Sequence, residues 1–344
     1  MRDINNYPLI SHNTFGIEAQ CKRFLEYAST EEAQIVAQHI RLAANDFLII
    51  GSGSNLLLTT DYSGIVVTPA TMTDINKGIT FVDNKGGIKC WAGLVFDDVV
   101  AYAIDHKLYG LENLSLIPGE VGASAVQNIG AYGCEAKDAI ESIEAVEIST
   151  GRIVEINAKD CNYSYRQSKF KNEWKNKFLI TYVTYRLQTS FTPHLDYGNI
   201  RSELEKRGIT DPTAHQLREV IIDIRNAKLP DPKVEGNAGS FFMNPIVDEE
   251  MFKKLSSRYE NMPHYVVNTD SGHTMYKIPA GWMIDQCGWK GKTMGKAGVH
   301  SKQALVLVNK GGATGNDIVQ LMKAIQEDVY KQFGISLHPE VNII

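Results

Sequence analysis

Short apolar runs separated by turn residues dominate the first half of the chain, and amphipathic stretches of helical period follow in the second half. The alternating and continuous apolar runs predict strands, and apolar positions three or four residues apart predict helices. We expect strands at 47–50, 64–67, 87–91, 142–148, 152–156, 178–187, 304–309 and 335–343, and helices at 96–106, 199–207, 215–228, 248–259 and 314–333. This mixture predicts an α+β protein built from several small layers.

A change of texture near residue 230 marks a candidate hinge. The helix expected at 215–228 runs into Leu229-Pro230-Asp231-Pro232, and two prolines forbid its continuation. A domain boundary is therefore expected at about this point.

Two loops are rich in small residues, and the first follows the strand-like run at 47–50. Gly51 to Asn55 reads GSGSN, and Ile117 to Gly133 reads IPGEVGASAVQNIGAYG, with four glycines and one charged side chain. Small residues leave backbone N–H groups unshielded, which suits phosphate binding, although tight buried turns would have the same composition. A G-x-G-x-x-G dinucleotide fingerprint fails because Leu56 stands at the last glycine position, and a P-loop fails because Gln286 stands where its first glycine belongs.

Composition narrows the class of protein. The 344 residues are 43% apolar and 22% charged, and the formal charge of −5 gives no electrostatic footprint for nucleic acid. The five cysteines are far apart, and the nine histidines lack metal-ligand spacings, so neither disulfides nor a metal site is expected. No segment approaches the length of a membrane span, and a cytoplasmic protein is expected.

Three segments carry candidate chemistry. Arg166, in YSYR from residue 163, could anchor a carboxylate, although a lone arginine is more often a surface ion pair. Ser240 lies in GNAGSFFMNP from residue 236, where unshielded backbone surrounds one hydroxyl. Glu340, in HPEV from residue 338, would be costly to bury unless paired or protonated, and an exposed edge-strand glutamate is the alternative.

Taken together, these segments resemble one family, the UDP-N-acetylenolpyruvoylglucosamine reductases of bacterial peptidoglycan synthesis. The resemblance spans nearly the whole chain and is carried, in order, by NTFG from residue 13, GSGSN from 51, IPGEVGASAVQNIGAYG from 117, YSYRQSKF from 163, KLPDPKV from 228, GNAGSFFMNP from 236, AGWMIDQCGWKG from 280 and HPEV from 338. It implies a vanillyl-alcohol-oxidase-type FAD-binding fold of two subdomains, expected at 1–70 and 71–228, with a substrate-binding domain at 229–333. Residues 334–344 are a candidate completion of the first subdomain.

The resemblance also implies which residues form the site. The cofactor would be FAD, held by Gly51, Ser52, Gly53, Ser54, Asn55, Pro118, Gly119, Gly122, Ala123, Ser124, Asn128, Gly130 and Ala131. The catalytic trio would be Arg166, Ser240 and Glu340, and the substrate would contact Tyr132, Tyr165, Tyr197, Lys228, Asn244 and Gln303. Tyr197 marks the longer of the family's two forms. The chain departs from many relatives at Met243, often lysine, and at Asn342, often arginine.

The implied reaction has two half-reactions, in which NADPH reduces the flavin and the flavin then reduces UDP-N-acetylglucosamine enolpyruvate. Arg166 would meet the charge that grows on the substrate carboxylate, and Glu340 is expected to keep its proton because burial disfavours the charged form. Ser240 would protonate the carbon that bears the ether oxygen. Two other interpretations stay open: a flavin oxidase of the same fold acting on another sugar or alcohol, and a noncatalytic nucleotide-binding module. A monomer is favoured as the oligomeric state.

Overall fold

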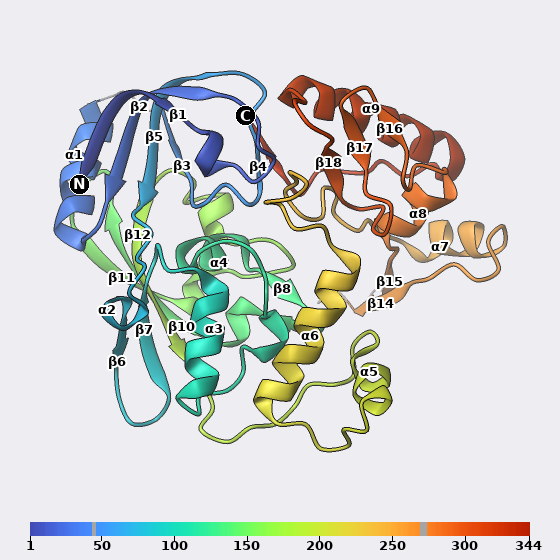
Figure 1. Ribbon diagram of the computed structural model, residues 1–344, viewed down its shortest axis with the longest axis horizontal. Coiled ribbons are helices and arrows are strands. Elements are labelled where there is room, and N and C mark those ends of the chain that lie inside the picture. Colours follow the sequence, from blue (N-terminus) through green and yellow to red (C-terminus); the bar gives the residue numbers. More distant parts are fainter. Residues whose placement is uncertain (43–45, 269–273) are drawn as a thin grey trace. The chain divides into compact units, whose positions relative to one another are not determined.

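The structure is a computed structural model that describes residues 1–42, 46–268 and 274–344. Its elements, labelled in Figure 1, group into two units. Unit 1 comprises Met1–Tyr7, Gln20–Ser52 and Tyr62–Ala227, and unit 2 comprises Pro8–Ala19, Gly53–Asp61 and Lys228–Ile344. The change of unit at residue 228 falls two residues before the proline pair, whereas the three-part functional division stays a prediction.

Unit 1 is built on two sheets. The four-stranded sheet has the order β1 (Arg2–Pro8), β2 (Gln20–Tyr27), β5 (Tyr62–Pro69), β3 (Phe47–Ile49), and β5 runs parallel to both β2 and β3. The five-stranded sheet has the order β11 (Ile153–Asn157), β10 (Ile140–Glu147), β12 (Phe178–Arg186), β7 (Gly87–Trp91), β6 (Ile79–Phe81), with antiparallel pairing throughout.

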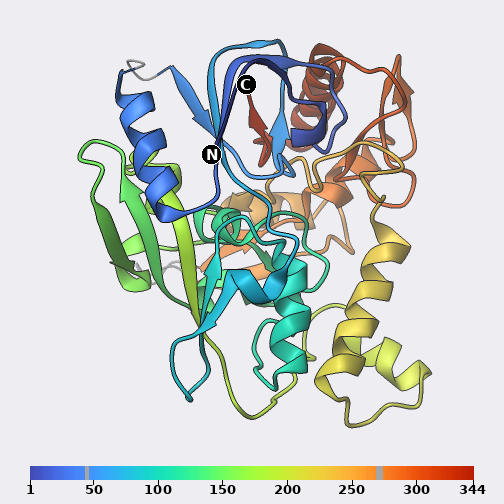
Figure 2. The same cartoon turned by 60° about the vertical axis from the view of Figure 1, so that its left-hand side comes forward.

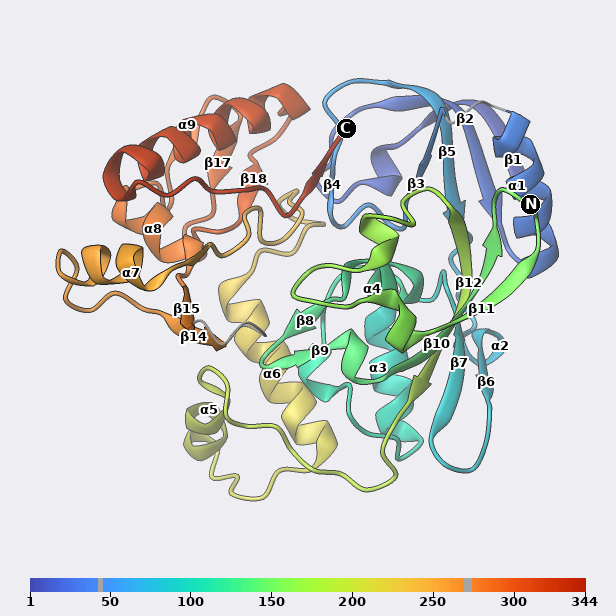
Figure 3. The same ribbon diagram turned by 180° about the vertical axis from the view of Figure 1, so that it is seen from behind.

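The helices of unit 1 are α1 (Thr30–Leu42), α2 (Ile75–Gly78), α3 (Phe96–Asp105), α4 (Val121–Gln127), α5 (Ile200–Lys206) and α6 (Ala214–Lys228), the last residue of which belongs to unit 2. Short 3₁₀ turns lie at Glu112–Leu114, Ala136–Asp138, Ala158–Cys161 and Lys169–Lys171, and β8 (Gly130–Ala131) and β9 (Cys134–Glu135) form a small hairpin. Figure 2 shows α1 beside the strands of the four-stranded sheet, and Figure 3 shows α3 and α4 next to β7 and β12.

Aromatic side chains join the two sheets of unit 1. Tyr27 is buried in β2 and donates its hydroxyl to the carbonyl of Ile180 in β12 at 2.8 Å. Its ring makes an edge contact with Trp91, and Trp91 makes another with Tyr182. Edge-to-face pairs of this kind stabilise a core beyond the area that they bury. A single apolar cluster therefore extends from the first sheet through the second.

Unit 2 is built from small sheets and three helices. Its sheets are β13 (Ile246–Val247), β15 (Thr274–Lys277), β14 (Tyr265–Asn268); β16 (Thr293–Met294), β17 (Ala297–Val299), β18 (Leu307–Asn309); and the parallel pair β4 (Leu56–Leu57) and β19 (Asn342–Ile343). The helices are α7 (Glu249–Ser256), α8 (Ala280–Gln286) and α9 (Gly315–Phe333), and a 3₁₀ turn lies at Ile10–His12. Buried residues of α8, α9 and β17 form the core of the unit.

The structure corrects three expectations about the elements. The sequence analysis missed α1, whose buried Ala33, Val36, Ala37 and Ile40 do have helical spacing. It also expected only loop over 117–133, where α4 forms because alanine and serine tolerate a helix. The strand expected at 335–343 is limited to β19, because Pro339 lacks an N–H group and pairs through an isolated bridge.

The α+β class and most of the expected helices are confirmed. The structure gives α3 at Phe96–Asp105, α6 at Ala214–Lys228 and α9 at Gly315–Phe333, within one residue of the expected ends. Helix α9 begins with a capping box in which Thr314 and Asp317 exchange hydrogen bonds, and it ends at Gly334 with φ +72°. The capping box and the C-terminal glycine are local signals that can be recognised in the sequence.

Candidate functional site

The Arg166 turn lies at the tip of a tight loop of unit 1. Ser164 and Gln167 exchange two backbone hydrogen bonds, at 3.1 and 3.0 Å, so that Tyr165 and Arg166 form the bend. Arg166 has φ +57°, a conformation that costs a non-glycine residue energy and is found where function demands it. Its guanidinium donates from Nη2 to the carbonyl of Gly130 at 2.9 Å, which ties the turn to the second small-residue loop.

Hydrogen bonds of the Asn128 side chain hold this turn in place. It is buried and has φ +48°, and its Nδ2 donates to the carbonyl of Ser164 at 2.9 Å and to Glu135 at 3.1 Å. Its Oδ1 accepts the Lys137 N–H at 3.0 Å. Asparagine tolerates this backbone conformation better than other residues with a side chain. The side chain of Asn128 thus holds the loop, and contact with a cofactor would fall to its backbone.

Three tyrosines expected at the site lie in unit 1. The Tyr165 ring lies 5.6 Å from the Arg166 guanidinium, in cation–π geometry. Tyr132 has φ +48°, its carbonyl accepts a hydrogen bond from Asn113 Nδ2 at 2.9 Å, and its ring meets Tyr197 edge-on at 6.5 Å between centroids. Tyr197 is 40% exposed, so it is available to a ligand. The structure therefore brings Tyr132 and Tyr197 together, as a site requires.

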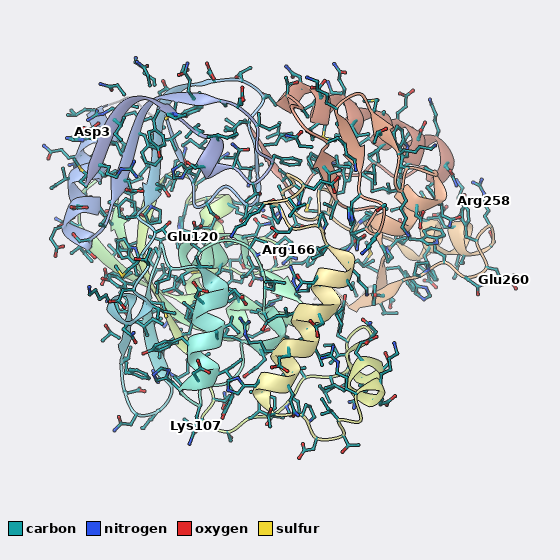
Figure 4. All side chains as sticks on the ribbon, viewed as in Figure 1. Asp3, Lys107, Glu120, Arg166, Arg258 and Glu260 are labelled. Carbon is teal, nitrogen blue, oxygen red and sulfur yellow. The ribbon has the colours of Figure 1, made fainter. Side chains whose placement is uncertain are left out.

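The first small-residue loop is closed by a buried acid. The N–H of Ser52 donates to Oε2 of Glu120 at 2.7 Å, and a Cβ on Gly51 would come within 2.2 Å of the same oxygen. A side chain at position 51 would therefore displace the Glu120 carboxylate from its present position. Burial raises the pKa of Glu120, and the hydrogen bonds from Ser52 only partly oppose this rise. Figure 4 shows Glu120 at the start of α4 and Arg166 on its turn.

The second loop presents small residues whose backbone stays accessible. Pro118 is exposed, and Gly119, Ala123, Gly130 and Ala131 are half-exposed. Ser124 differs, because it is fully buried and its hydroxyl bonds to the Val121 carbonyl at 2.7 Å and to the Tyr185 hydroxyl at 2.8 Å. Gly122 is buried too, and a Cβ there would lie 3.0 Å from Ala92.

The Ser240 segment lies in unit 2 between two other segments. Ser240 is bridged to Val306, and the Phe241 N–H donates to the Leu305 carbonyl at 2.8 Å. On the other side the Phe241 carbonyl accepts the Glu340 N–H at 2.8 Å, and Phe242 is bridged to Pro339. The backbone therefore holds the segments of Ser240 and Glu340 next to each other. Ser240 is exposed and Glu340 half-exposed, so the burial expected for Glu340 is not found within unit 2.

The loop before Ser240 explains the NTFG motif at residue 13. Buried Asn237 receives the Gly239 N–H on its Oδ1 at 2.9 Å and donates to the Glu235 carbonyl at 2.8 Å, and its own N–H donates to the Thr14 carbonyl. A Cβ on Gly236 would come within 2.2 Å of the Phe15 carbonyl oxygen. The N-terminal motif therefore packs under the serine loop and fixes its path.

Asn244 and Gln303 both lie near the first residues of α8, although neither belongs to that helix. Asn244 Oδ1 accepts the Ala280 N–H at 2.9 Å, and Gln303 Oε1 accepts the Leu305 N–H at 3.3 Å. A Cβ on Gly281 would lie 3.3 Å from that Gln303 oxygen. Lys228 is exposed at the end of α6. Asn244, Gln303, Ser240 and Glu340 are thus assembled within unit 2.

The remaining part of the first loop, residues 53–55, is joined to the C-terminal strand. The Asn55 carbonyl accepts both the Asn342 N–H and its Nδ2, each at 3.1 Å, and Asn55 Nδ2 donates to the Glu340 carbonyl at 3.3 Å. A Cβ on Gly53, with φ +72°, would come within 1.9 Å of the His12 carbonyl oxygen. Asn342, where many relatives were expected to carry arginine, thus serves a backbone contact to the GSGSN loop.

Sequence reasoning missed two residues that the structure places at the site. Glu120 lies inside the second small-residue loop, where the sequence showed it only as the one charged side chain of that loop. Arg225 lies on α6, where it was counted among ordinary residues of an amphipathic helix, and its Nε atom is buried. The signal available in the sequence was the position of Arg225, because it lies three residues before Lys228 near the end of the same helix.

The chemistry of the residues in the two small-residue loops fits FAD. Two loops of small, partly exposed residues leave main chain unshielded, the first of them following β3, and hydroxyl groups of Ser52 and Ser54 lie in that first loop. Residues 22–157, which span both loops, match the FAD binding domain. Residues 231–344 match the C-terminal domain of UDP-N-acetylenolpyruvoylglucosamine reductase. The fold and these loops define an FAD-dependent oxidoreductase of the vanillyl-alcohol-oxidase type.

Similarity over the full length then gives the family. The chain is 50% identical over 341 residues to UDP-N-acetylenolpyruvoylglucosamine reductase of Bacteroides fragilis, covering 98% of this chain and 99% of the relative. It is 45% identical to the enzyme of that name from Burkholderia ambifaria, with 97% and 95% covered, and 42% identical to that of Flavobacterium johnsoniae, with 99% of both covered. The crystal structure of the Thermus caldophilus reductase covers 99% of this chain and 98% of its own, at TM-score 0.66 and 22% identity, which supports the fold. The chain belongs to the UDP-N-acetylenolpyruvoylglucosamine reductase family.

Within the described ranges, no helix combines the length and the apolar character that a membrane span requires. Nor do the described His, Cys, Asp and Glu residues gather into a group that could hold a metal ion.

Proposed function

We propose that this enzyme uses NADPH to reduce UDP-N-acetylglucosamine enolpyruvate to UDP-N-acetylmuramate in the cytoplasm, as a step of peptidoglycan synthesis, and that it acts as a monomer. The observation that carries the proposal is the pairing of the Ser240 segment with the Glu340 segment through main-chain hydrogen bonds. A hydroxyl and a carboxyl carried on paired segments would suit proton delivery to carbon, which a reductase needs and an oxidase does not.

The cofactor residues would hold FAD through backbone rather than through side chains. Gly51, Gly119, Gly130 and Ala131 are partly exposed, so their main chain would face its pyrophosphate and ring system, whereas the Ser52 N–H already donates to Glu120. Bound FAD would supply the hydride chemistry: it would accept a hydride from NADPH in one half-reaction and donate a hydride to the enol ether in the other.

Arg166 would bind the substrate carboxylate. A guanidinium is permanently cationic and planar, so it can grip a carboxylate with two parallel hydrogen bonds. As negative charge grows on that carboxylate in the transition state, the attraction strengthens, and this difference lowers the barrier. The hydrogen bond to Gly130 and the closed turn fix the direction of the guanidinium before the substrate arrives.

Ser240 would donate the proton from its Oγ to the carbon that bears the ether oxygen, and Glu340 would assist from the paired segment. A serine hydroxyl is a weak acid, so its contribution rests on position and on the strong basicity of the carbon that accepts the proton. Lys228, Asn244 and Gln303 would contact the diphosphate of the nucleotide sugar, and Tyr132, Tyr165 and Tyr197 would line the site.

An anaerobic absorbance titration tests the proposal. NADPH should bleach the flavin band of the purified protein, and UDP-N-acetylglucosamine enolpyruvate should then restore it. A band that recovers only when air is admitted would replace the proposal with an oxidase. A protein that binds no FAD after reconstitution would contradict the enzyme assignment altogether.

A further inference from the structure

Arg225 is a partly buried cation that makes no ion pair within the part of the chain that the structure describes. It lies in the last turn of α6, its side chain is half-buried, and its Nε atom is buried with no hydrogen-bond partner among the residues that the structure describes. Leaving this N–H group desolvated and without an acceptor costs free energy.

The acid that would be its natural partner is already engaged. Asp97 accepts hydrogen bonds from Arg218 Nη1 at 2.6 Å and Nη2 at 3.0 Å, and its Oδ1 also accepts the Leu116 N–H at 2.5 Å. Arg218 lies seven residues before Arg225 on the same helix, which is two turns away on the same face. One helix face therefore carries one paired arginine and one unpaired arginine.

The surroundings of Arg225 belong to the Arg166 half of the site. Tyr132, the residue whose ring meets Tyr197, packs on the apolar residues of α5 and α6. Burial lowers the pKa of Arg225, the charge of Arg166 lowers it further, and Tyr132 and Asp97 oppose that shift. Tyr132 packs on the same face of α6 and lies two residues from Gly130, whose carbonyl accepts the Arg166 hydrogen bond, so α6 and the Arg166 turn border the same loop.

We propose that Arg225 is a second anion-binding arginine of the Arg166 site and binds an oxyanion of the nucleotide-sugar substrate, either its carboxylate or a phosphate. The inference rests on the proposed function and deepens it. The free energy that the unpaired guanidinium costs the ligand-free enzyme is recovered when the oxyanion arrives, so that Arg225 trades stability for affinity.

The first experiment separates a ligand-binding role from a structural one, with a paired variant on the same helix as the control. Thermal unfolding of the FAD-loaded enzyme should show Arg225→Met at least as stable as the wild type, because no internal partner is lost. Arg218→Met should be clearly less stable, because it leaves the half-buried Asp97 carboxylate without its cation and without two hydrogen bonds. If Arg225→Met and Arg225→Lys are both destabilised like Arg218→Met, Arg225 is a structural residue and the proposal fails.

The second experiment measures binding to the oxidised FAD-loaded enzyme through the change in flavin absorbance. UDP-N-acetylglucosamine enolpyruvate carries a carboxylate and a diphosphate, whereas UDP-N-acetylglucosamine carries the diphosphate alone. Arg225→Met should bind the first ligand about tenfold or more weakly, as expected for a lost hydrogen bond to a charged group. Arg225→Lys should recover part of the loss, because it keeps the charge without the fork. Arg207→Met, which removes an exposed arginine paired with Asp223, should bind like the wild type.

The two ligands identify the oxyanion. A loss confined to the enolpyruvate ligand assigns Arg225 to the carboxylate, and an equal loss for both ligands assigns it to the diphosphate. Wild-type affinity of Arg225→Met for both ligands would overturn the inference while the proposed function stands. Failure of the wild type to bind either ligand would instead overturn the proposed function, and the inference with it.

Discussion

The Arg166 turn and the Ser240 segment carry the two halves of the proposed chemistry, but they are held in place by different means. Every non-glycine residue with positive φ in the described chain lies in unit 1, and Asn128, Tyr132, Asn162 and Arg166 lie in or beside the small-residue loop and the turn. The Ser240 segment has extended backbone pairing with 305–306 on one side and 339–340 on the other.

The difference shows where each half is vulnerable. Strained backbone persists only when surrounding groups over-determine it, and in unit 1 the buried side chain of Asn128 does so. The Ser240 segment needs no such help, because main-chain hydrogen bonds fix it whatever side chain it carries. Substitution of a bracing residue should therefore disturb the Arg166 turn, whereas substitution of Ser240 should remove one hydroxyl and little else.

The largest expected effect is that of Ser240→Ala. Flavin reduction by NADPH should keep its rate, and reoxidation by the enolpyruvyl substrate should slow by about 10² to 10⁴-fold, the usual contribution of a general acid. Anaerobic stopped-flow absorbance measures both half-reactions. Ser336→Ala, at an exposed serine of the same unit, is the matched control and should leave both unchanged. Equal slowing of both half-reactions by Ser240→Ala would contradict its role as the proton donor.

Arg166→Lys should slow the same reoxidation step by about 10 to 10²-fold, because the charge remains while the two-pronged contact with a carboxylate is lost. Stopped-flow reoxidation measures this rate, and thermal unfolding reports the turn. We expect only a small change in stability, since lysine keeps the same strained backbone and loses the single bond to Gly130. A lysine variant with wild-type reoxidation would show that charge alone suffices at this position.

Asn128→Ala should destabilise the protein by about 2–4 kcal/mol, because it removes buried hydrogen bonds and places alanine at positive φ. Asn128→Gly removes the same bonds but accepts the backbone, so the difference between the two variants measures strain, about 1 kcal/mol. Urea unfolding measures both. If the two variants are equally stable, the turn stores no strain at Asn128 and the comparison of the two halves loses its basis.

Asn237→Ala is the counterpart of Asn128→Ala in unit 2. It removes the hydrogen bonds to Gly239 and Glu235 but leaves the bridges of Ser240 intact, so a smaller loss of about 1–3 kcal/mol is expected. The same urea experiment measures it. A loss greater than that of Asn128→Ala would show that the serine loop depends on its side-chain brace more than on its backbone pairing.

The smallest effect concerns pH. Burial raises the pKa of Glu120 above its ordinary value of 4.5, so the folded chain binds this proton more tightly than the unfolded chain. Its contribution therefore favours the folded state below the unfolded pKa and is lost as pH rises from there through the folded pKa. Glu120→Gln keeps an oxygen for the Ser52 N–H and cannot ionise, so its stability should decline less over that window. Denaturant midpoints of both proteins across this range measure the difference, and parallel curves would contradict the buried, titrating carboxyl.

Most of the helices could be predicted because their signals are local. The apolar spacing of α3 and α9, the capping pair Thr314 and Asp317, and the prolines after α6 are all visible in the order of residues. The short α4 could not be predicted in this way, because glycine and alanine suited a phosphate loop and a buried helix equally well. Its burial against β12 and α3 decided the outcome.

For the candidate site, the sequence by itself determined which residues to watch: the two small-residue loops, Arg166, Ser240 and Glu340, through motifs whose order identified the family. The tertiary structure decided what those residues contact. Gly51 packs against Glu120, and the NTFG motif packs against the loop before Ser240. The Ser124 hydroxyl bonds to the buried Tyr185 hydroxyl, and the buried Nε atom of Arg225 has no hydrogen-bond partner in the part of the chain that the structure describes. The physical reason is that motifs record residue types along the chain, whereas burial, partnership and unpaired charge arise only where distant segments meet.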